Sequence, residues 1–96
     1  MRCMLKLELD TEAGNKAIET GMLPKIMQQV LDKTKAEAAY FSTESGRRTA
    51  FIFFDLVDAS DIPVIAEPAF ANLGARVTFT PVMNSDDLRK GLAQLG

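Results

Sequence analysis

The sequence predicts an α+β fold, in which an antiparallel sheet carries helices on one of its faces. The first observation is a set of segments in which apolar and polar residues alternate, as they do in half-buried strands. The second is that segments of helical spacing interrupt these strands in the order strand, helix, strand, strand, helix, strand. The third is the stretch 47–58, which is apolar on both alternating faces. Such a strand needs cover on both sides.

Length and composition predict one domain, residues 1–96, with 47% hydrophobic and 25% charged residues. A chain this short buries only about 60–65% of the surface that it exposes when unfolded. Forming a homodimer is one way to hide more apolar surface, so composition favours a dimer slightly.

Several classes of function are disfavoured. The net charge is −2, and Arg47-Arg48 is the only basic cluster, so we expect no nucleic-acid partner. Cys3 is the only cysteine and there is no histidine, so the chain has neither an internal disulfide nor thiolate or imidazole sites, and we expect no metal and no cofactor. No window is long enough to span a membrane, and no leader is recognisable. We therefore expect a cytoplasmic protein without a membrane partner, with Cys3 in its core.

The first strand is predicted over residues 3–10, with Cys3, Leu5, Leu7 and Leu9 on one face. Asp10 and Thr11 are candidate N-caps of a helix from Thr11 to Lys33. Gly21 and Pro24 interrupt this helix, because proline lacks an amide donor. The interruption predicts either a kink or a break that places Pro24 near the first turn of a second helix.

A hairpin is predicted next, from a strand at 37–43, a turn at 44–47 and the central strand. A two-residue loop at Ser45-Gly46 pairs Tyr40 with Phe51 and Ala38 with Phe53, and places Ala39 opposite Ile52 and Phe41 opposite Ala50. A three-residue loop would shift the register and spoil this agreement between the faces.

In the second half, Asp58 or Ser60 is expected to cap a helix that ends at Gly74. Pro63 fits its first turn, whereas Pro68 should bend it with the proline on the solvent side. A last strand is predicted at 75–83. Residues 84–87 then cap a short helix that carries Leu88, Leu92 and Leu95.

This order is that of a ferredoxin-like βαββαβ sandwich with an added C-terminal helix and the strand order 4-1-3-2. The first and third strands are then central, and the helices cover one face. The predicted core beneath them is Leu5, Leu7, Leu9, Ile26, Val30, Phe41, Ile52, Phe54, Leu56, Ile65, Phe70, Leu73, Val77 and Phe79.

The opposite face of the sheet, which we call the open face, holds Met4, Thr80 and the candidate ligand-binding residues. These candidates are Lys6, Glu8, Tyr40, Ser42, Phe51, Phe53, Asp55, Arg76 and Thr78. Aromatic walls with a few convergent polar groups suit a small-molecule pocket, in which Lys6, Glu8 or Asp55 could transfer protons. The competing interpretation is that Glu8 pairs with Arg76, and Asp55 with Arg2, as ordinary cross-strand ion pairs. Tyr40 is expected to set its ring against Phe51 and its hydroxyl into the cavity.

Three other sets of charged residues give weaker indications of function. Glu67 is expected to be solvated, and Arg47-Arg48 could bind an anion but is typical of a soluble loop. The acids Asp55, Asp58 and Asp61 straddle a strand end and a helix start, where caps explain two of them better than a cation does.

With one face left half-apolar, the pattern resembles the dimeric α+β barrel proteins, in which two such sheets close around a shared interior. Locally, 66–70 (AEPAF) and 80–88 (TPVMNSDDL) are similar to a group of short bacterial proteins of unassigned function. The resemblance implies a homodimer, and some such barrels are cofactor-free monooxygenases or isomerases. Their pockets often use histidine or tryptophan, and this chain has neither. Three hypotheses follow: a dimer that binds a small molecule between its sheets, a cofactor-independent enzyme in the same cavity, or a structural dimer without a ligand.

Overall fold

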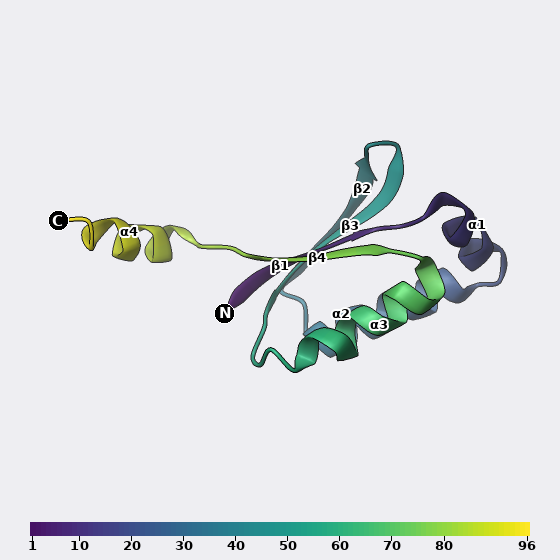
Figure 1. Cartoon of the computed structure of the whole chain (residues 1–96), viewed down its shortest axis with the longest axis horizontal. Helices are drawn as coiled ribbons and strands as arrows, with labels where there is room; N and C mark the ends of the chain where they lie inside the picture. The colour runs from purple at the N-terminus through teal and green to yellow at the C-terminus, as the bar shows by residue number, and fades with distance from the viewer.

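The computed structural model describes residues 1–96 and contains four strands and four helices (Figure 1). In chain order they are β1 (Arg2–Glu8), α1 (Thr11–Glu19), α2 (Met22–Thr34), β2 (Ala38–Glu44), β3 (Arg47–Asp55), α3 (Asp61–Leu73), β4 (Arg76–Pro81) and α4 (Ser85–Ala93). No helix is long and apolar enough to cross a membrane.

The strands form one antiparallel sheet in the order β2-β3-β1-β4, so the predicted central strands are central. The helices α2 and α3 lie side by side along one face, with α1 near its end (Figure 1). This is an α+β fold consistent with a ferredoxin-like sandwich. The helix α4 lies apart from these two layers (Figure 1).

The predicted hairpin register is confirmed. Tyr40 pairs with Phe51, Ala38 with Phe53, and Phe41 with Ala50. The two loop residues, Ser45 and Gly46, have φ angles of 53° and 75°. Positive φ at both positions is what a tight turn between twisted strands requires, and glycine adopts it without steric cost.

The helix predicted from Thr11 to Lys33 is broken into two helices, which was one of the two predicted alternatives. The helix α1 ends at Glu19, and Gly21 adopts a left-handed conformation, with φ 73°, before α2 begins at Met22. Pro24 then falls in the first turn of α2, where its missing amide has no partner to lose. Asp10 caps α1 by accepting a hydrogen bond from the Ala13 amide at 3.0 Å.

Pro68 lies inside α3, half-buried rather than on the solvent side as expected, and α3 continues through it. Because proline has no N–H, the carbonyl of Val64 lacks its helical donor. Lys33 Nζ of α2 donates to that carbonyl at 3.4 Å. Ser60 precedes α3 without a side-chain cap bond. Its amide and hydroxyl donate to Asp58 Oδ1 at 2.9 and 2.7 Å, so Asp58 orders the turn into the helix.

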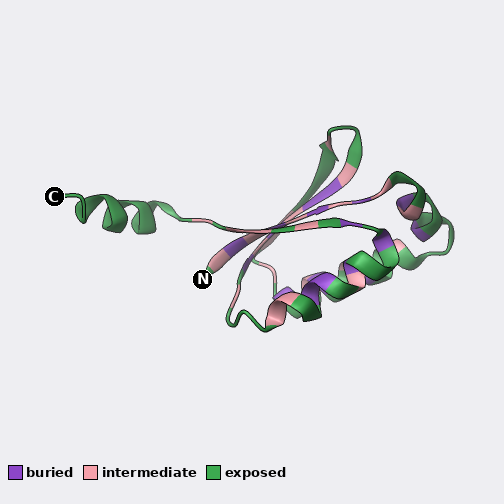
Figure 2. Cartoon of the chain, viewed as in Figure 1, coloured by how far each residue is buried: buried purple, intermediate pink, exposed green.

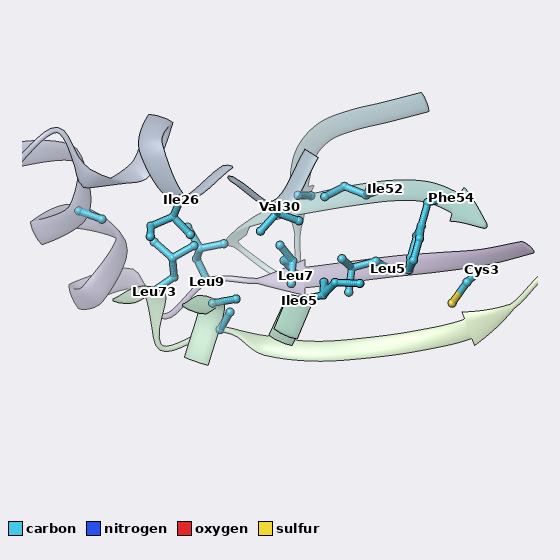
Figure 3. Packing of buried hydrophobic residues seen from close by; sticks show 14 residues of the cluster. Cys3, Leu5, Leu7, Leu9, Ile26, Val30, Ile52, Phe54, Ile65 and Leu73 are labelled. Atoms are coloured by element: carbon cyan, nitrogen blue, oxygen red, sulfur yellow. The ribbon is translucent and has the colours of Figure 1, made fainter. Parts of the chain in front are cut away.

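The core lies between the sheet and the helices (Figure 3). It joins alternate residues of β1 and β3 to Ile26, Val30, Ile65 and Leu73. Cys3 is buried there, as predicted. Three predicted core residues, Leu56, Val77 and Phe79, are only partly buried and pack against it. Two more lie in the solvent: Phe41 is 58% exposed and Phe70 is 47% exposed. Phe41 belongs to an edge strand that the helices leave uncovered, and Ala69 takes the buried place beside Phe70 on α3.

The helix α4 is capped as predicted but has no partner. Asn84 Oδ1 accepts from the Asp87 amide at 2.8 Å, and the Asp87 carboxylate accepts from the Asn84 amide at 3.1 Å. This reciprocal pair satisfies two donors at the helix start. None of the α4 residues is buried (Figure 2). The last predicted leucine, Leu95, lies just past the end of the helix.

Candidate functional site

The open face is assembled by the pairing of all four strands. Alternate residues of β1, from Met4 to Glu8, share it with Phe51 and Phe53 of β3, because the antiparallel register places these residues opposite one another. On β4, Arg76 lies opposite Glu8, Thr78 opposite Lys6, and Thr80 opposite Met4. On β2, Tyr40 lies opposite Phe51, and Ser42 opposite Thr49. The backbone therefore brings together the predicted set except Asp55, which lies at the far end of β3.

The aromatic residues of the open face are only partly covered. Phe51 and Phe53 are half-buried, and the Tyr40 side chain is 65% exposed. The Tyr40 ring meets Phe53 edge to face, with centroids 6.5 Å apart and planes at 73°. The expected partner of that ring was Phe51, which lies directly opposite on the strand. The side chain leans along the strand instead, so that it reaches the diagonal neighbour.

The end of the open face next to the β2–β3 hairpin carries a line of four charged residues. Lys6 Nζ lies 2.8 Å from Glu44 Oε2 and 3.6 Å from Glu8 Oε1, and Arg76 Nη1 lies 3.8 Å from Glu8 Oε2. The predicted pair of Glu8 with Arg76 is thus present. The close contact with the Glu44 carboxylate is the main cause that raises the pKa of Lys6, and burial opposes it. Lys6 is therefore held as a cation between two carboxylates.

Glu44 is a member of this line that the sequence analysis assigned to the turn. Strand β2 extends one residue further than predicted, to Glu44. Because side chains alternate between faces, residues 40, 42 and 44 share the open face. Extending the alternation of β2 to the two-residue loop would have identified Glu44.

The predicted pair of Asp55 with Arg2 is wrong, although the two residues lie opposite each other in the register. Asp55 Oδ1 accepts from the N-terminal ammonium of Met1 at 2.7 Å. Arg2 instead binds Glu37 through Nε and Nη2, at 3.1 and 3.2 Å. This bidentate contact with Glu37 raises the pKa of Arg2. Asp55 is exposed at the end of β3, away from the Lys6 line.

The open face of a single chain is a surface and not a cavity. None of the four hollows in the structure is lined by Lys6, Glu8, Tyr40, Phe51 or Phe53. A second apolar surface laid over this face would enclose the aromatic rings and the charged line together.

No group of three or more His, Cys, Asp or Glu side chains is placed to hold a metal ion. Asp58, one of the three acids weighed as a cation site, is engaged by Ser60. The remaining chemistry of the open face consists of an ammonium, two carboxylates, a guanidinium, hydroxyls and aromatic rings. No protein-family model matches the chain, and no curated protein matches it either.

Proposed function

We propose that the protein is a homodimer, built as a dimeric α+β barrel, that binds a small molecule between the open faces of its two sheets. The observation that carries the proposal is the pairing of half-buried and exposed aromatic residues with an ordered charged line on a sheet face that no element of the chain covers. Small-molecule sites combine such apolar walls with a few fixed polar groups.

The apolar part of the open face supports the dimer. Each large side chain taken out of water contributes about 1.5–3 kcal/mol. The domain as a whole is expected to be stable by only about 5–15 kcal/mol. Leaving Tyr40, Phe51 and Phe53 partly in water in each chain therefore forgoes a useful part of that stability. A second copy of the same face supplies matching aromatic surface through a two-fold axis.

The polar part supports a bound molecule. Lys6, Glu8 and Glu44 hold one another in place, so that the ammonium and carboxylates face the enclosed space in a fixed arrangement. Fixed polar groups orient a ligand without a further cost of ordering them. The Tyr40 hydroxyl, which has no hydrogen-bond partner within the chain, adds a donor and acceptor at the edge of the aromatic wall.

Native mass spectrometry of the gently purified protein tests this function. We expect the mass of two chains plus a small molecule that is released on denaturation. Replacing Tyr40→Phe should lower the occupancy of that molecule with the dimer intact, because a hydrogen bond to the ligand is lost. Thr43→Val, which removes a hydroxyl from the same strand on its other face, is the matched control.

A two-chain mass that carries no small molecule would support the structural dimer with a filled interface and would contradict binding. Loss of the circular-dichroism signal in Tyr40→Phe would show instead that the hydroxyl is needed for folding.

A further inference from the structure

The helix α4 presents an apolar stripe to solvent. Leu88 and Leu92 are four residues apart, so they lie along one side of the helix, and Leu95 follows just past its end. They are 46%, 56% and 82% exposed. The helix projects from the end of β4, away from the sheet and from α1–α3 (Figure 1). A helix of nine residues is marginal in water without packing, so α4 needs a partner surface.

An apolar groove that nothing fills lies on the helix side of the sheet, between α2 and the β2–β3 hairpin. We call it the hairpin groove. Its volume is about 350 Å³, and it is lined by Leu9, Leu23, Pro24, Met27, Phe41, Ser42, Arg48, Thr49 and Ala50. Phe41, the exposed aromatic residue of β2, forms one wall. Phe41, which was predicted to lie in the core, therefore lies in the wall of this groove instead.

Arg48 is the one charged residue among those that line the hairpin groove. It is half-buried, and its Nη2 donates to Asn15 Oδ1 at 2.9 Å. No carboxylate of the chain forms an ion pair with it. The first turn of α4, in contrast, carries Asp86, which pairs with Arg89, and Asp87, whose carboxylate accepts from the Asn84 amide. The charges of the groove and of the helix start are therefore complementary.

In the proposed dimer, the strand order brings α4 of one protomer close to the hairpin groove of the other. The edges of the sheet are β2 and β4. When two such sheets close into a barrel around a two-fold axis that runs parallel to the strands, the β4 edge of one protomer meets the β2 edge of the other. The chain leaves β4 at Pro81, and α4 begins at Ser85. The helix therefore arrives beside the partner's β2, which carries Phe41 and borders the hairpin groove.

We propose that α4 of each protomer docks in the hairpin groove of a second copy of this chain, with its leucines against the apolar walls and its first-turn acids toward the partner's Arg48. This inference rests on the proposed dimer and adds an exchanged arm to it. The arms would cover Phe41 and the leucine stripe, so that the interface extends beyond the sheet faces toward the size typical of stable dimers.

Disulfide trapping between two differently substituted chains tests the docking directly. One chain carries Phe41→Cys and the other Leu92→Cys, and the two are refolded together and mildly oxidised. We expect a covalent dimer of the two chains, because the groove wall and the stripe lie in contact across the interface. Phe70→Cys mixed with Leu92→Cys is the matched control. Phe70 is also an exposed phenylalanine but lies on α3 outside the groove, so no covalent dimer should form.

Light scattering on Leu92→Asp supplies the second measurement. The dimer Kd should rise about tenfold or more, because an apolar contact is replaced by a desolvated charge. Gln94→Asp makes the same change of charge on the other side of α4 and should leave the Kd within about twofold.

The possible outcomes separate the docking from the dimer. A dimer by light scattering that gives no trapped product overturns the arm exchange and leaves the proposed dimer standing. A monomer at high micromolar concentration overturns both. An internal disulfide in a chain that carries both Phe41→Cys and Leu92→Cys, with none between mixed chains, means that α4 folds back on its own protomer and overturns the proposal. A last outcome is that the chain binds decanoate, that Arg48→Gln abolishes this binding and Arg47→Gln preserves it, and that no disulfide-linked dimer forms. This outcome would assign the hairpin groove to an anionic amphiphile and would also overturn the proposal.

Discussion

Cys3 shows how the environment of one residue decides its chemistry. Its side chain is 2% exposed, in the core beneath the helices. Burial disfavours the thiolate and raises the pKa of Cys3 above its ordinary value. Since the thiolate is the reactive form, the buried thiol should be inert while the protein is folded. At neutral pH the Cys3 thiol is protonated in both the folded and the unfolded state, so its ionisation does not affect stability. Above about pH 9 the thiol ionises more readily in the unfolded state, which destabilises the fold.

We therefore expect native Cys3 to react with an aromatic disulfide reagent at pH 8 at least about a hundredfold more slowly than in guanidinium chloride. Absorbance of the released thiolate measures both rates. In a Cys3→Ala background, Met83→Cys is the control, because Met83 is 68% exposed and its replacement should react quickly in the folded protein. Equal rates for native and unfolded Cys3 would contradict the burial.

Asp58 makes stability depend on pH at the acid end. Hydrogen bonds from the Ser60 amide and then from its hydroxyl lower the pKa of Asp58. A lowered pKa in the folded state contributes stability that is present above the unfolded pKa and is lost as the pH falls through the folded value. The contribution should thus be complete at pH 7 and fade below about pH 3.8.

Urea unfolding of Asp58→Ala should accordingly show a larger loss of stability at pH 7 than at pH 3. Asp58→Asn keeps an acceptor for the Ser60 amide but has no carboxyl group to titrate. It should retain much of the stability at pH 7 and lose the pH dependence. A cost of Asp58→Ala that does not change with pH would show that the charge plays no part.

At the scale of elements, Lys33 of α2 supplies a hydrogen-bond donor that Pro68 removes from α3. Pro68 deprives the Val64 carbonyl of its helical donor, and Lys33 Nζ occupies the vacant position at 3.4 Å. Lys33→Met should lower the free energy of unfolding by about 0.5–1 kcal/mol, because the carbonyl loses its protein donor. Lys25→Met, an exposed lysine of α2 that forms no ion pair, is the control.

Restoring the donor tests the same explanation. In a Pro68→Ala background, the new amide can bond the Val64 carbonyl, so the cost of Lys33→Met should fall to near zero. Denaturant titrations of the four proteins in this cycle measure the coupling. An unchanged cost in the Pro68→Ala background would show that Lys33 stabilises the two helices in some other way.

At the scale of the whole molecule, the proposed dimer makes the state of assembly depend on the open face. Phe53→Asp puts a charge at the centre of the proposed interface in both protomers. Because each phenylalanine contributes about 1.5–3 kcal/mol on burial, the dimer Kd should rise at least about a hundredfold. Light scattering behind a sizing column should show the unmutated chain at twice its mass of 10.5 kDa. Phe53→Asp should be monomeric or aggregated.

Phe70→Asp makes the same substitution at a phenylalanine of α3 that is 47% exposed and lies away from the open face, so it should leave the dimer intact. Dissociation by Phe70→Asp to the same extent would place the interface elsewhere. A clean monomer for the unmutated chain at high micromolar concentration would refute the barrel and the site that it encloses.

Elements whose signals are local could be predicted from the amino-acid sequence. Alternation in β1 placed Leu5 and Leu7 in the core. Ser45 and Gly46 adopt positive φ angles, which allow a two-residue loop, and this loop set the hairpin register. The capping box of α4 was likewise readable from 84–87, because all its partners lie within one turn. The candidate open face followed from the same alternation, and so did its pair of Glu8 with Arg76.

Only the tertiary structure decided which faces are covered and which side chains meet. Phe41 points to the helix side of the sheet, as alternation requires, yet it lies in an edge strand that α2 does not reach, and it forms a groove wall instead of core. Tyr40 meets Phe53, and Asp55 binds the N-terminal ammonium, because side chains lean toward diagonal and terminal neighbours that pairing alone does not specify. A periodic pattern assigns a residue to a face, but the distance to the neighbouring element determines whether that face is buried.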